Sequence, residues 1–186
     1  GLSNLDGIEK ATNLKFAELS NCKLTDVSKL ESLSGITSLN LSGNKLESLN
    51  GISANKDMEL LYVNSCNLTS LEGLKGLSKL EGIDVGGNPL KNLNGIEDSK
   101  NTLKNLYATN CVDSSIEITE DESMDEEATE AEQKKQRTLV DASALEGFTK
   151  LETVDLSSNM LTGIDFLASL ESLKSVTLTG NEIASV

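Results

Sequence analysis

The chain has 186 residues, of which 37% are apolar and only 3% are aromatic. This length suffices for one domain with a sizeable core, and that core must consist of Leu, Ile and Val. The net charge of −14 argues against a nucleic-acid partner, because Lys and Arg are the residues that bind phosphates. No apolar run reaches the roughly 18 residues that a membrane span needs, so we expect no membrane insertion.

A single pattern recurs along the chain, and the stretch from Ile36 to Leu46 illustrates it as L-x-x-L-x-L-x-x-N-x-L. The pattern occurs seven times, with its first position at Leu14, Ile36, Met58, Leu80, Leu103, Leu151 and Leu173. The steps between these positions are 22, 22, 22, 23, 48 and 22 residues. Such a fixed period is typical of an architecture in which each repeat stacks on its neighbours.

Each repeat has two parts that differ in the spacing of their apolar residues. In the first part apolar residues alternate with polar ones, as at Leu39 and Leu41, which predicts a short strand. In the second part every third residue is apolar, as at Leu68, Leu71 and Leu74. That spacing favours turns or a short 3-10 segment over an α-helix. One coil cannot bury its own apolar face, whereas seven stacked coils form a continuous core.

These motifs resemble the leucine-rich repeat family. The 22-residue period and the segment Leu46-Glu-Ser-Leu49-Asn-Gly-Ile52 are similar to a short subclass that includes bacterial internalins and a eukaryotic phosphatase regulatory subunit. The resemblance implies an α/β fold in which residues 1–186 form one right-handed solenoid, or horseshoe. A parallel sheet of about seven strands would line its concave face, with short 3-10 or turn segments on the convex side.

The Asn of the template has a structural role at the bend where the backbone leaves the sheet. A buried Asn side chain can bind the N–H and C=O groups that lose their ladder partners there. Cys is a familiar substitute in the family, so the predicted ladder consists of Cys22, Asn44, Cys66, Asn88, Cys111, Asn159 and Asn181. The cysteines then lie in alternate coils, about 10 Å apart. A disulfide spans at most about 7 Å between Cα atoms, so we predict three free, buried thiols.

The template fails once, in coil five, where Asp113 occupies a position expected to hold Leu. The pattern resumes at Leu139, so residues 113–138 form an insertion with ten acidic and three basic residues. A capping box of Ser123 and Glu126 predicts a short solvated helix, and the scarcity of apolar residues leaves a disordered loop as the alternative. The insertion could be a tolerated surface loop, a part of the binding face or a calcium site, although it lacks EF-hand spacing.

Residues between the apolar template positions point out of the concave sheet, because side chains alternate along a strand. Three of the five aromatic residues lie there, although packing of the core does not require them at those positions. Together with a leucine they would form an exposed apolar patch with a polar rim, which is typical of protein-binding hot spots. The alternative is that Tyr merely suits a strand. The predicted partner-binding residues are Phe16, Glu18, Leu60, Tyr62, Asp84, Asn105, Tyr107 and Asp155.

The sequence carries no catalytic or metal-binding constellation. It has no His, no zinc-ligand spacing, no G-x-G-x-x-G and no P-loop. A buried cysteine without a histidine to activate it is also a poor nucleophile. We therefore predict no enzyme, no cofactor and no metal site, but a module that binds a protein ligand; the oligomeric state stays open.

The resemblance also bears on the biological setting. Aromatic residues on the concave face of internalins contact host proteins, which favours an interaction module of a larger bacterial surface or secreted protein. The chain begins at Gly1 inside a repeat and without a signal peptide, so we expect a piece of a longer protein. An intracellular, cytoplasmic regulatory scaffold of the phosphatase-associated type is the alternative, and free thiols suit that reducing compartment. Carbohydrate binding on the concave Tyr residues is weaker, because the chain lacks Trp.

Overall fold

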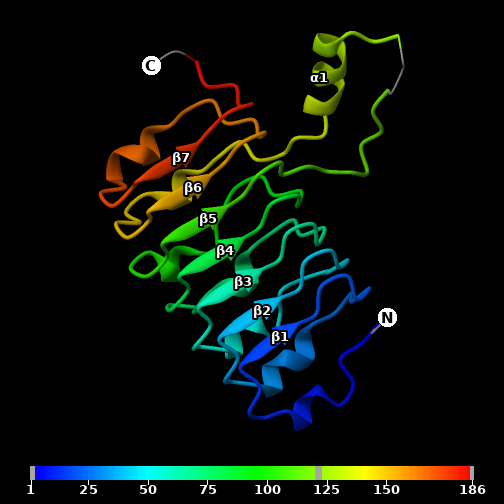
Figure 1. Cartoon of the computed structure of the whole chain (residues 1–186), viewed down its shortest axis with the longest axis vertical. Helices are drawn as coiled ribbons and strands as arrows, with labels where there is room; N and C mark the ends of the chain where they lie inside the picture. Colours follow the sequence, from blue (N-terminus) through cyan, green and yellow to red (C-terminus); the bar gives the residue numbers. More distant parts are fainter. Residues whose placement is uncertain (1–2, 120–122, 185–186) are drawn as a thin grey trace.

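The computed structural model describes residues 3–119 and 123–184. In this part of the chain, seven parallel strands form one sheet in sequence order (Figure 1). The strands are β1 (Phe16–Glu18), β2 (Ser38–Asn40), β3 (Leu60–Tyr62), β4 (Gly82–Asp84), β5 (Asn105–Tyr107), β6 (Thr153–Asp155) and β7 (Ser175–Thr177). The predicted sheet of about seven parallel strands is therefore confirmed.

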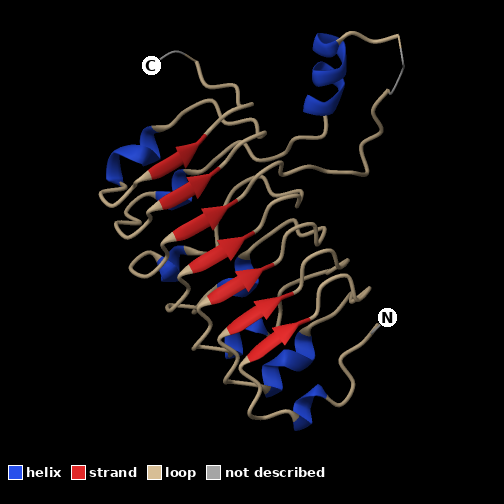
Figure 2. Ribbon diagram, viewed as in Figure 1, coloured by secondary structure: helices blue, strands red, loops and turns tan. Residues whose placement is uncertain are grey.

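Between strands the chain returns along the opposite face, where it forms short 3-10 segments (Figure 2). Within the described residues these segments are Ile8–Lys10, Ser28–Ser32, Ile52–Ala54, Glu72–Leu74, Glu97–Ser99, Ser143–Leu145 and Asp165–Ser169. A 3-10 helix has three residues per turn, which matches the apolar spacing of the return segments. The predicted leucine-rich repeat solenoid, with strands on one face and 3-10 turns on the other, is confirmed.

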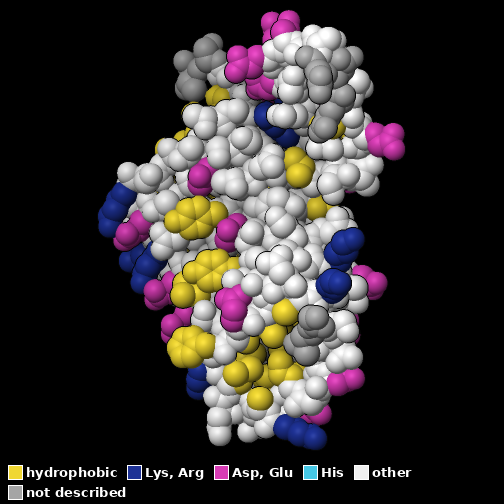
Figure 3. All heavy atoms as spheres, turned by 45° about the vertical axis from the view of Figure 1, so that its right-hand side comes forward, with side chains coloured by type: hydrophobic (Ala, Val, Ile, Leu, Met, Phe, Trp, Pro, Cys, Tyr) yellow, Lys and Arg dark blue, Asp and Glu magenta, His cyan; other side chains and the backbone are white. Residues whose placement is uncertain are grey.

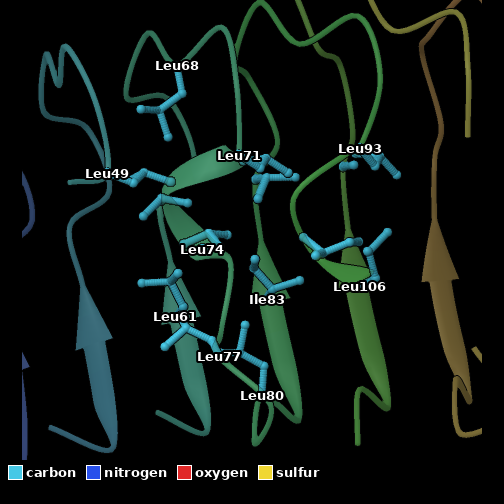
Figure 4. Close-up of a cluster of buried hydrophobic side chains, with 14 of the residues drawn as sticks. Leu49, Leu61, Leu68, Leu71, Leu74, Leu77, Leu80, Ile83, Leu93 and Leu106 are labelled. Atoms are coloured by element: carbon cyan, nitrogen blue, oxygen red, sulfur yellow. The ribbon is translucent and has the colours of Figure 1, made fainter. Parts of the chain in front are cut away.

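The core lies between the sheet and the return segments and runs the length of the solenoid. Leu61 and Leu106 point into it from the strands, and Leu71 and Leu74 meet them from the other side (Figure 4). Each of these four side chains is at most 1% exposed, so neighbouring coils share one continuous core. Aromatic rings are not excluded from it, because Phe148 and Phe166 are buried in the coils after the insertion.

The Asn side chains of the ladder tie each coil to the one before it. Oδ1 of Asn44 accepts hydrogen bonds from the backbone N–H of Cys22 (3.1 Å) and of Leu24 (2.9 Å). Nδ2 of the same side chain donates to the carbonyls of Leu19 (2.9 Å) and Leu41 (2.6 Å). One buried amide thus satisfies four backbone groups in two coils, as a bend that leaves the sheet requires.

The three cysteines are free thiols, but they are not equally buried. Cys66 and Cys111 lie in the core, where burial raises the pKa of both thiols, that of Cys111 to about 12. These two thiols stay protonated at neutral pH, and a protonated thiol is a poor nucleophile. The prediction of a buried thiol is wrong for Cys22, which is half-buried. Its coil includes β1, the edge strand of the sheet, so no further strand covers its outer side.

Close contact between coils on the convex side depends on glycine. At Gly51 an added Cβ would come within 2.6 Å of the carbonyl oxygen of Ser28 in the preceding coil. At Gly95 it would come within 2.4 Å of the carbonyl oxygen of Leu71, again one coil earlier. Both glycines also have positive φ, which a residue with a side chain adopts only at a cost.

The insertion leaves the repeat at the carboxyl end of β5 and returns to the same place. An antiparallel bridge between Val112 and Arg137 closes its base. The register of the sheet is unaffected across it, since Asn105 of β5 pairs with Thr153 of β6. Figure 1 shows the insertion projecting away from the solenoid, beyond the ends of the strands.

The insertion contains helix α1 (Glu126–Lys134). Its N-cap is Asp125, whose side chain accepts a hydrogen bond from the N–H of Ala128 (2.9 Å). The sequence-based N-cap at Ser123 was therefore wrong by two residues, because the Asp125 carboxylate takes that role. Three of the acidic residues of the insertion, at positions 120–122, lie outside the described residues.

Within the described residues, an ion pair and a hydrogen bond join the insertion to the last coil. Nζ of Lys134 lies 2.9 Å from Oε1 of Glu182. A guanidinium nitrogen of Arg137 donates to the carbonyl oxygen of Gly180 (2.9 Å). Helix α1 is thereby held beside the coil that contains β7.

Candidate functional site

Two rows of side chains point from the sheet toward the concave side. The middle residues of strands β2 to β6, such as Leu61, are buried in the core, so their two neighbours face the other way. The sheet register aligns these neighbours across the strands. Row 1 consists of Phe16, Ser38, Leu60, Gly82, Asn105, Thr153 and Ser175. Row 2 consists of Glu18, Asn40, Tyr62, Asp84, Tyr107, Asp155 and Thr177.

The apolar members of these rows are accessible. The exposed fractions are 74% for Phe16, 37% for Leu60, 38% for Tyr62 and 40% for Tyr107, enough for each to touch a partner. We call these four residues the concave patch. Figure 3 shows apolar side chains in a column on the strand side of the solenoid, with acidic side chains between them.

A hollow of about 210 Å³ opens between the first two aromatic members of the patch. Phe16 and Tyr62 stand on either side of it, and Ser38 and Asn40 of the intervening strand β2 lie between them. Since these two residues are small, strand β2 separates the two rings without filling the space. Ala17 and Glu18 complete the lining.

The position beside Leu60 in row 1 is Gly82, which leaves room for the end of the Leu60 side chain. A Cβ at Gly82 would lie 3.0 Å from Cδ2 of Leu60, which is closer than side chains normally pack. Because Gly82 has no side chain, the side chain of Leu60 can extend toward strand β4. Leu60 also lies two residues from Tyr62 on strand β3, on the same face of the sheet. Sequence reasoning identified Leu60 but missed the contribution of Gly82, which only the contact between the two strands reveals.

The carboxylates of row 2 have local structural bonds as well as a place on the surface. Oδ1 of Asp84 accepts from the N–H of Gly86, and Oδ1 of Asp155 from the N–H of Ser157, both at 3.0 Å. Oδ1 of Asn40 accepts in the same way from the N–H of Ser42, two residues later in the chain. Sequence reasoning read the two aspartates as binding residues only, although an Asp or Asn two residues before a turn commonly makes this bond.

The local bonds and burial shift the acidity of two carboxyl groups. Hydrogen bonds from Ser20 and Asn40 hold the pKa of Glu18 below its ordinary value, so this group is ionised at neutral pH. Burial raises the pKa of Asp84, and one backbone hydrogen bond from Gly86 offsets part of that effect. The remaining predicted members of the rim, Asn105 and Asp155, are half-buried in their rows.

A second, polar hollow of about 450 Å³ lies at the rim, next to the start of the insertion. Bend residues from several coils line it, together with Val112 and Ser114. It contains no cluster of aromatic side chains, so it lacks the apolar anchors of the concave patch.

The described residues offer no obvious metal site or membrane span. Among them, no three His, Cys, Asp or Glu side chains converge so as to hold a metal ion. None of the helices in residues 3–119 and 123–184 combines the length and apolar character needed to cross a membrane.

Sequence comparison identifies the repeats directly. Residues 12–54 match a family model of two leucine-rich repeat copies, and residues 150–170 match a leucine-rich repeat model. No curated protein matches the chain.

Structural comparison finds similar solenoids in bacterial proteins. An internalin (inlF) of Listeria monocytogenes has a TM-score of 0.81 at 23% identity, over 99% of this chain and 46% of that one. Internalin C2 of the same organism has a TM-score of 0.61 at 25% identity, over 96% and 77%. A leucine-rich repeat protein of Leptospira interrogans has a TM-score of 0.75 at 21% identity, over 95% and 40%. The chain thus spans less than half the length of the first internalin.

Domains of this type are typically protein-interaction modules and usually non-catalytic. The repeats matched in sequence, the seven-stranded sheet and the solenoid neighbours agree with one another. The chain is a leucine-rich repeat protein, and its structural neighbours include internalins.

Proposed function

We propose that this chain is a non-catalytic module that binds a protein partner on its concave face. The contact residues on this proposal are Phe16, Glu18, Leu60, Tyr62, Asp84, Asn105, Tyr107 and Asp155. We further propose that the module forms part of a larger bacterial surface or secreted protein. The greater length of the internalin neighbours supports this second part.

One observation carries the proposal. Four large apolar side chains, those of the concave patch, are exposed on one face in aligned positions of strands β1, β3 and β5. Exposed apolar groups of this kind with polar neighbours are characteristic of interaction sites, because burying them in a complex removes apolar surface from water. The core does not account for them, since the middle residues of these strands are the ones that face the core, buried in β3 and β5 and half-buried in β1.

The test is a pull-down from host and bacterial extracts with the wild-type chain and the double variant Tyr62→Ala/Tyr107→Ala. We expect the double variant to keep its fold, because both side chains are more than a third exposed and lie outside the core. It should bind the captured protein at least about tenfold more weakly, as is usual when two aromatic anchors are removed.

A matched control is Val140→Ala, which removes a side chain that is 55% exposed and belongs to neither row. It should capture the same protein with unchanged affinity. Equal capture by the wild-type chain and the double variant, with unchanged circular dichroism, would rule out the concave patch as the binding surface.

An intracellular regulatory scaffold is the second candidate, and the free thiols favour it. Exported proteins tend to pair their cysteines, whereas Cys22, Cys66 and Cys111 are all unpaired. The two candidates differ in the full-length gene. A signal peptide and a wall anchor in the complete reading frame support the surface protein, and a reading frame that has neither supports the scaffold.

A further inference from the structure

The hollow between Phe16 and Tyr62 has the composition of a site for a cationic side chain. Two aromatic rings flank it across strand β2, and small polar residues, Ser38 and Asn40, lie between them. Aromatic faces attract Lys and Arg cations through the negative potential of the ring. A flat side chain could enter between the rings, because nothing larger than Asn projects from the strand between them.

A carboxylate stands at the same hollow. Glu18 belongs to its lining, and Oε2 of Glu18 accepts a hydrogen bond from Nδ2 of Asn40 (3.1 Å). Oε1 accepts a bond from the N–H of Ser20 (3.4 Å), and the side chain of Ser20 also bonds the carboxylate. A cation between the rings would thus meet a charge partner whose position is already fixed by Asn40.

The charge of the whole concave face also favours a cationic ligand. Rows 1 and 2 contain three carboxylates, those of Glu18, Asp84 and Asp155, and no Lys or Arg. Lys15 precedes Phe16 in the chain, but its Nζ reaches toward Gly35, where it lies 3.0 Å from the position of an added Cβ. None of the described lysines belongs to the lining of the hollow, and the net charge of −14 attracts basic partners.

We infer that the hollow between Phe16 and Tyr62 receives an arginine side chain of the protein partner, with its guanidinium stacked between the rings and paired to Glu18. Arginine fits better than lysine, because its planar guanidinium stacks on aromatic faces and is more weakly hydrated than an ammonium group. Its fork of N–H donors also matches the geometry of a carboxylate. This inference rests on the proposed function, since it assigns the chemistry of the partner at the concave patch.

The test is an NMR titration of the ¹⁵N-labelled chain with three short peptides that differ in one side chain. The first peptide carries arginine, the second citrulline, which keeps the shape but has no charge, and the third lysine. We expect the arginine peptide to shift the amides of strands β1, β2 and β3 around the hollow. The citrulline peptide should bind about tenfold more weakly, since it loses both the cation–π contact and the ion pair.

Variants of the chain distinguish binding in the hollow from non-specific attraction of a cationic peptide to an acidic protein. Phe16→Ala removes a side chain that is 74% exposed. It should lower the affinity for the arginine peptide about fivefold without unfolding the chain. Glu18→Gln keeps an acceptor for Asn40 but removes the charge, and it should lower the affinity for the arginine peptide to a similar degree. Val140→Ala, outside both rows, should leave the affinity unchanged.

Several results would overturn the inference. These are shifts confined to the acidic insertion, equal binding of the citrulline peptide, equal binding of the lysine peptide, or no effect of either Phe16→Ala or Glu18→Gln. The pull-down keeps this failure apart from failure of the proposed function. If the protein captured through Tyr62 and Tyr107 is insensitive to excess arginine peptide and that peptide does not bind, the interaction module stands and only the arginine site is lost.

Discussion

At the scale of single residues, the buried amide of Asn88 bonds backbone groups of two neighbouring coils. Its Oδ1 accepts from the N–H groups of Cys66 and Leu68, both at 2.9 Å. Its Nδ2 donates to the carbonyls of Val63 and Val85, both at 2.8 Å. We expect Asn88→Ala to lower the free energy of unfolding by about 2–4 kcal/mol, because buried backbone groups lose their partners. Urea denaturation followed by circular dichroism measures this loss.

The matched control for Asn88 is Asn181→Ala in the last coil. Asn181 is only half-buried, and water can replace its contacts with Leu161, Leu156 and Leu178. Its loss should therefore be clearly smaller. Equal losses for the two variants would show that the ladder stabilises the fold independently of burial.

A second residue-scale prediction concerns pH. Because burial raises the pKa of Asp84 in the folded chain, its ionised form is less stable there than in the unfolded chain. The resulting destabilisation is present above the raised pKa and disappears once the pH falls below the ordinary value of 3.8. Asp84→Asn removes the charge but keeps an oxygen for the N–H of Gly86, as Asn40 does for Ser42.

We therefore expect Asp84→Asn to raise the free energy of unfolding at pH 7. The gain should shrink as the pH falls and vanish near pH 3, below the ordinary carboxyl value of 3.8. Denaturation curves for the variant and wild type at a series of pH values measure both effects. A variant less stable than wild type at pH 7 would contradict the stated sign.

At the scale of elements, the spacing between adjacent return segments is set by glycine. Gly95 has a φ of 113°, and an added Cβ would lie 2.4 Å from the carbonyl oxygen of Leu71. Gly95→Ala should therefore lower the free energy of unfolding by at least about 2 kcal/mol, through both backbone strain and displacement of the neighbouring coil. Thermal or urea denaturation provides the measurement.

Gly147 offers a control that separates the two causes. Its φ is also positive, at 80°, but an added Cβ would meet nothing within 4 Å. Gly147→Ala should lower the free energy of unfolding through backbone strain alone, by about 1 kcal/mol. If it were as harmful as Gly95→Ala, close packing between coils would not be the reason for glycine at position 95.

The insertion marks the limit of what local patterns could predict at this scale. Its position was predicted from the failed template at Asp113, and its helix from the capping box of Ser123 and Glu126. The N-cap at Asp125 was missed, because Ser, Thr, Asp and Asn all serve as caps and several stand close together here. The pairing of Lys134 with Glu182 was out of reach, since periodicity carries no information on contacts between the insertion and a later coil.

At the scale of the whole molecule, stability depends on how many neighbours each coil has. A central strand pairs on both sides, whereas β1 and β7 pair with another strand on one side only. Leu61 of β3 is fully buried, while Val176 at the equivalent position of β7 is 40% exposed. We expect Leu61→Ala to cost about 2–5 kcal/mol and Val176→Ala less than about 1 kcal/mol. Urea denaturation of both variants checks the difference.

Hydrogen exchange tests the same view without mutation. Amides in the coil of β7 should exchange faster than those of β3 and β4, because terminal coils open without breaking the central stack. Uniform exchange along the solenoid would instead indicate that all coils unfold together.

The sequence predicted the fold well because its repeated residues are the buried ones. The positions equivalent to Leu39 and Leu41 recur at fixed spacing, and a buried position restricts the side chain that can occupy it. The candidate site was predicted only in part, since the variable positions follow no repeating rule. Strand alternation predicted that Phe16 and Tyr62 point outward. The hollow between them could not be predicted in this way, because it depends on the space that the small side chain of Ser38 leaves open.

The distribution of ring-bearing residues gives the molecule an intrinsic optical reporter. The chain has no Trp, and its only two tyrosines, Tyr62 and Tyr107, both lie in the concave patch. Near-ultraviolet absorbance and tyrosine emission therefore originate almost entirely from the surface proposed to meet a partner. An occupant that lacks Tyr and Trp can be followed by the spectrum of the unlabelled protein, without a dye or a tag near the surface.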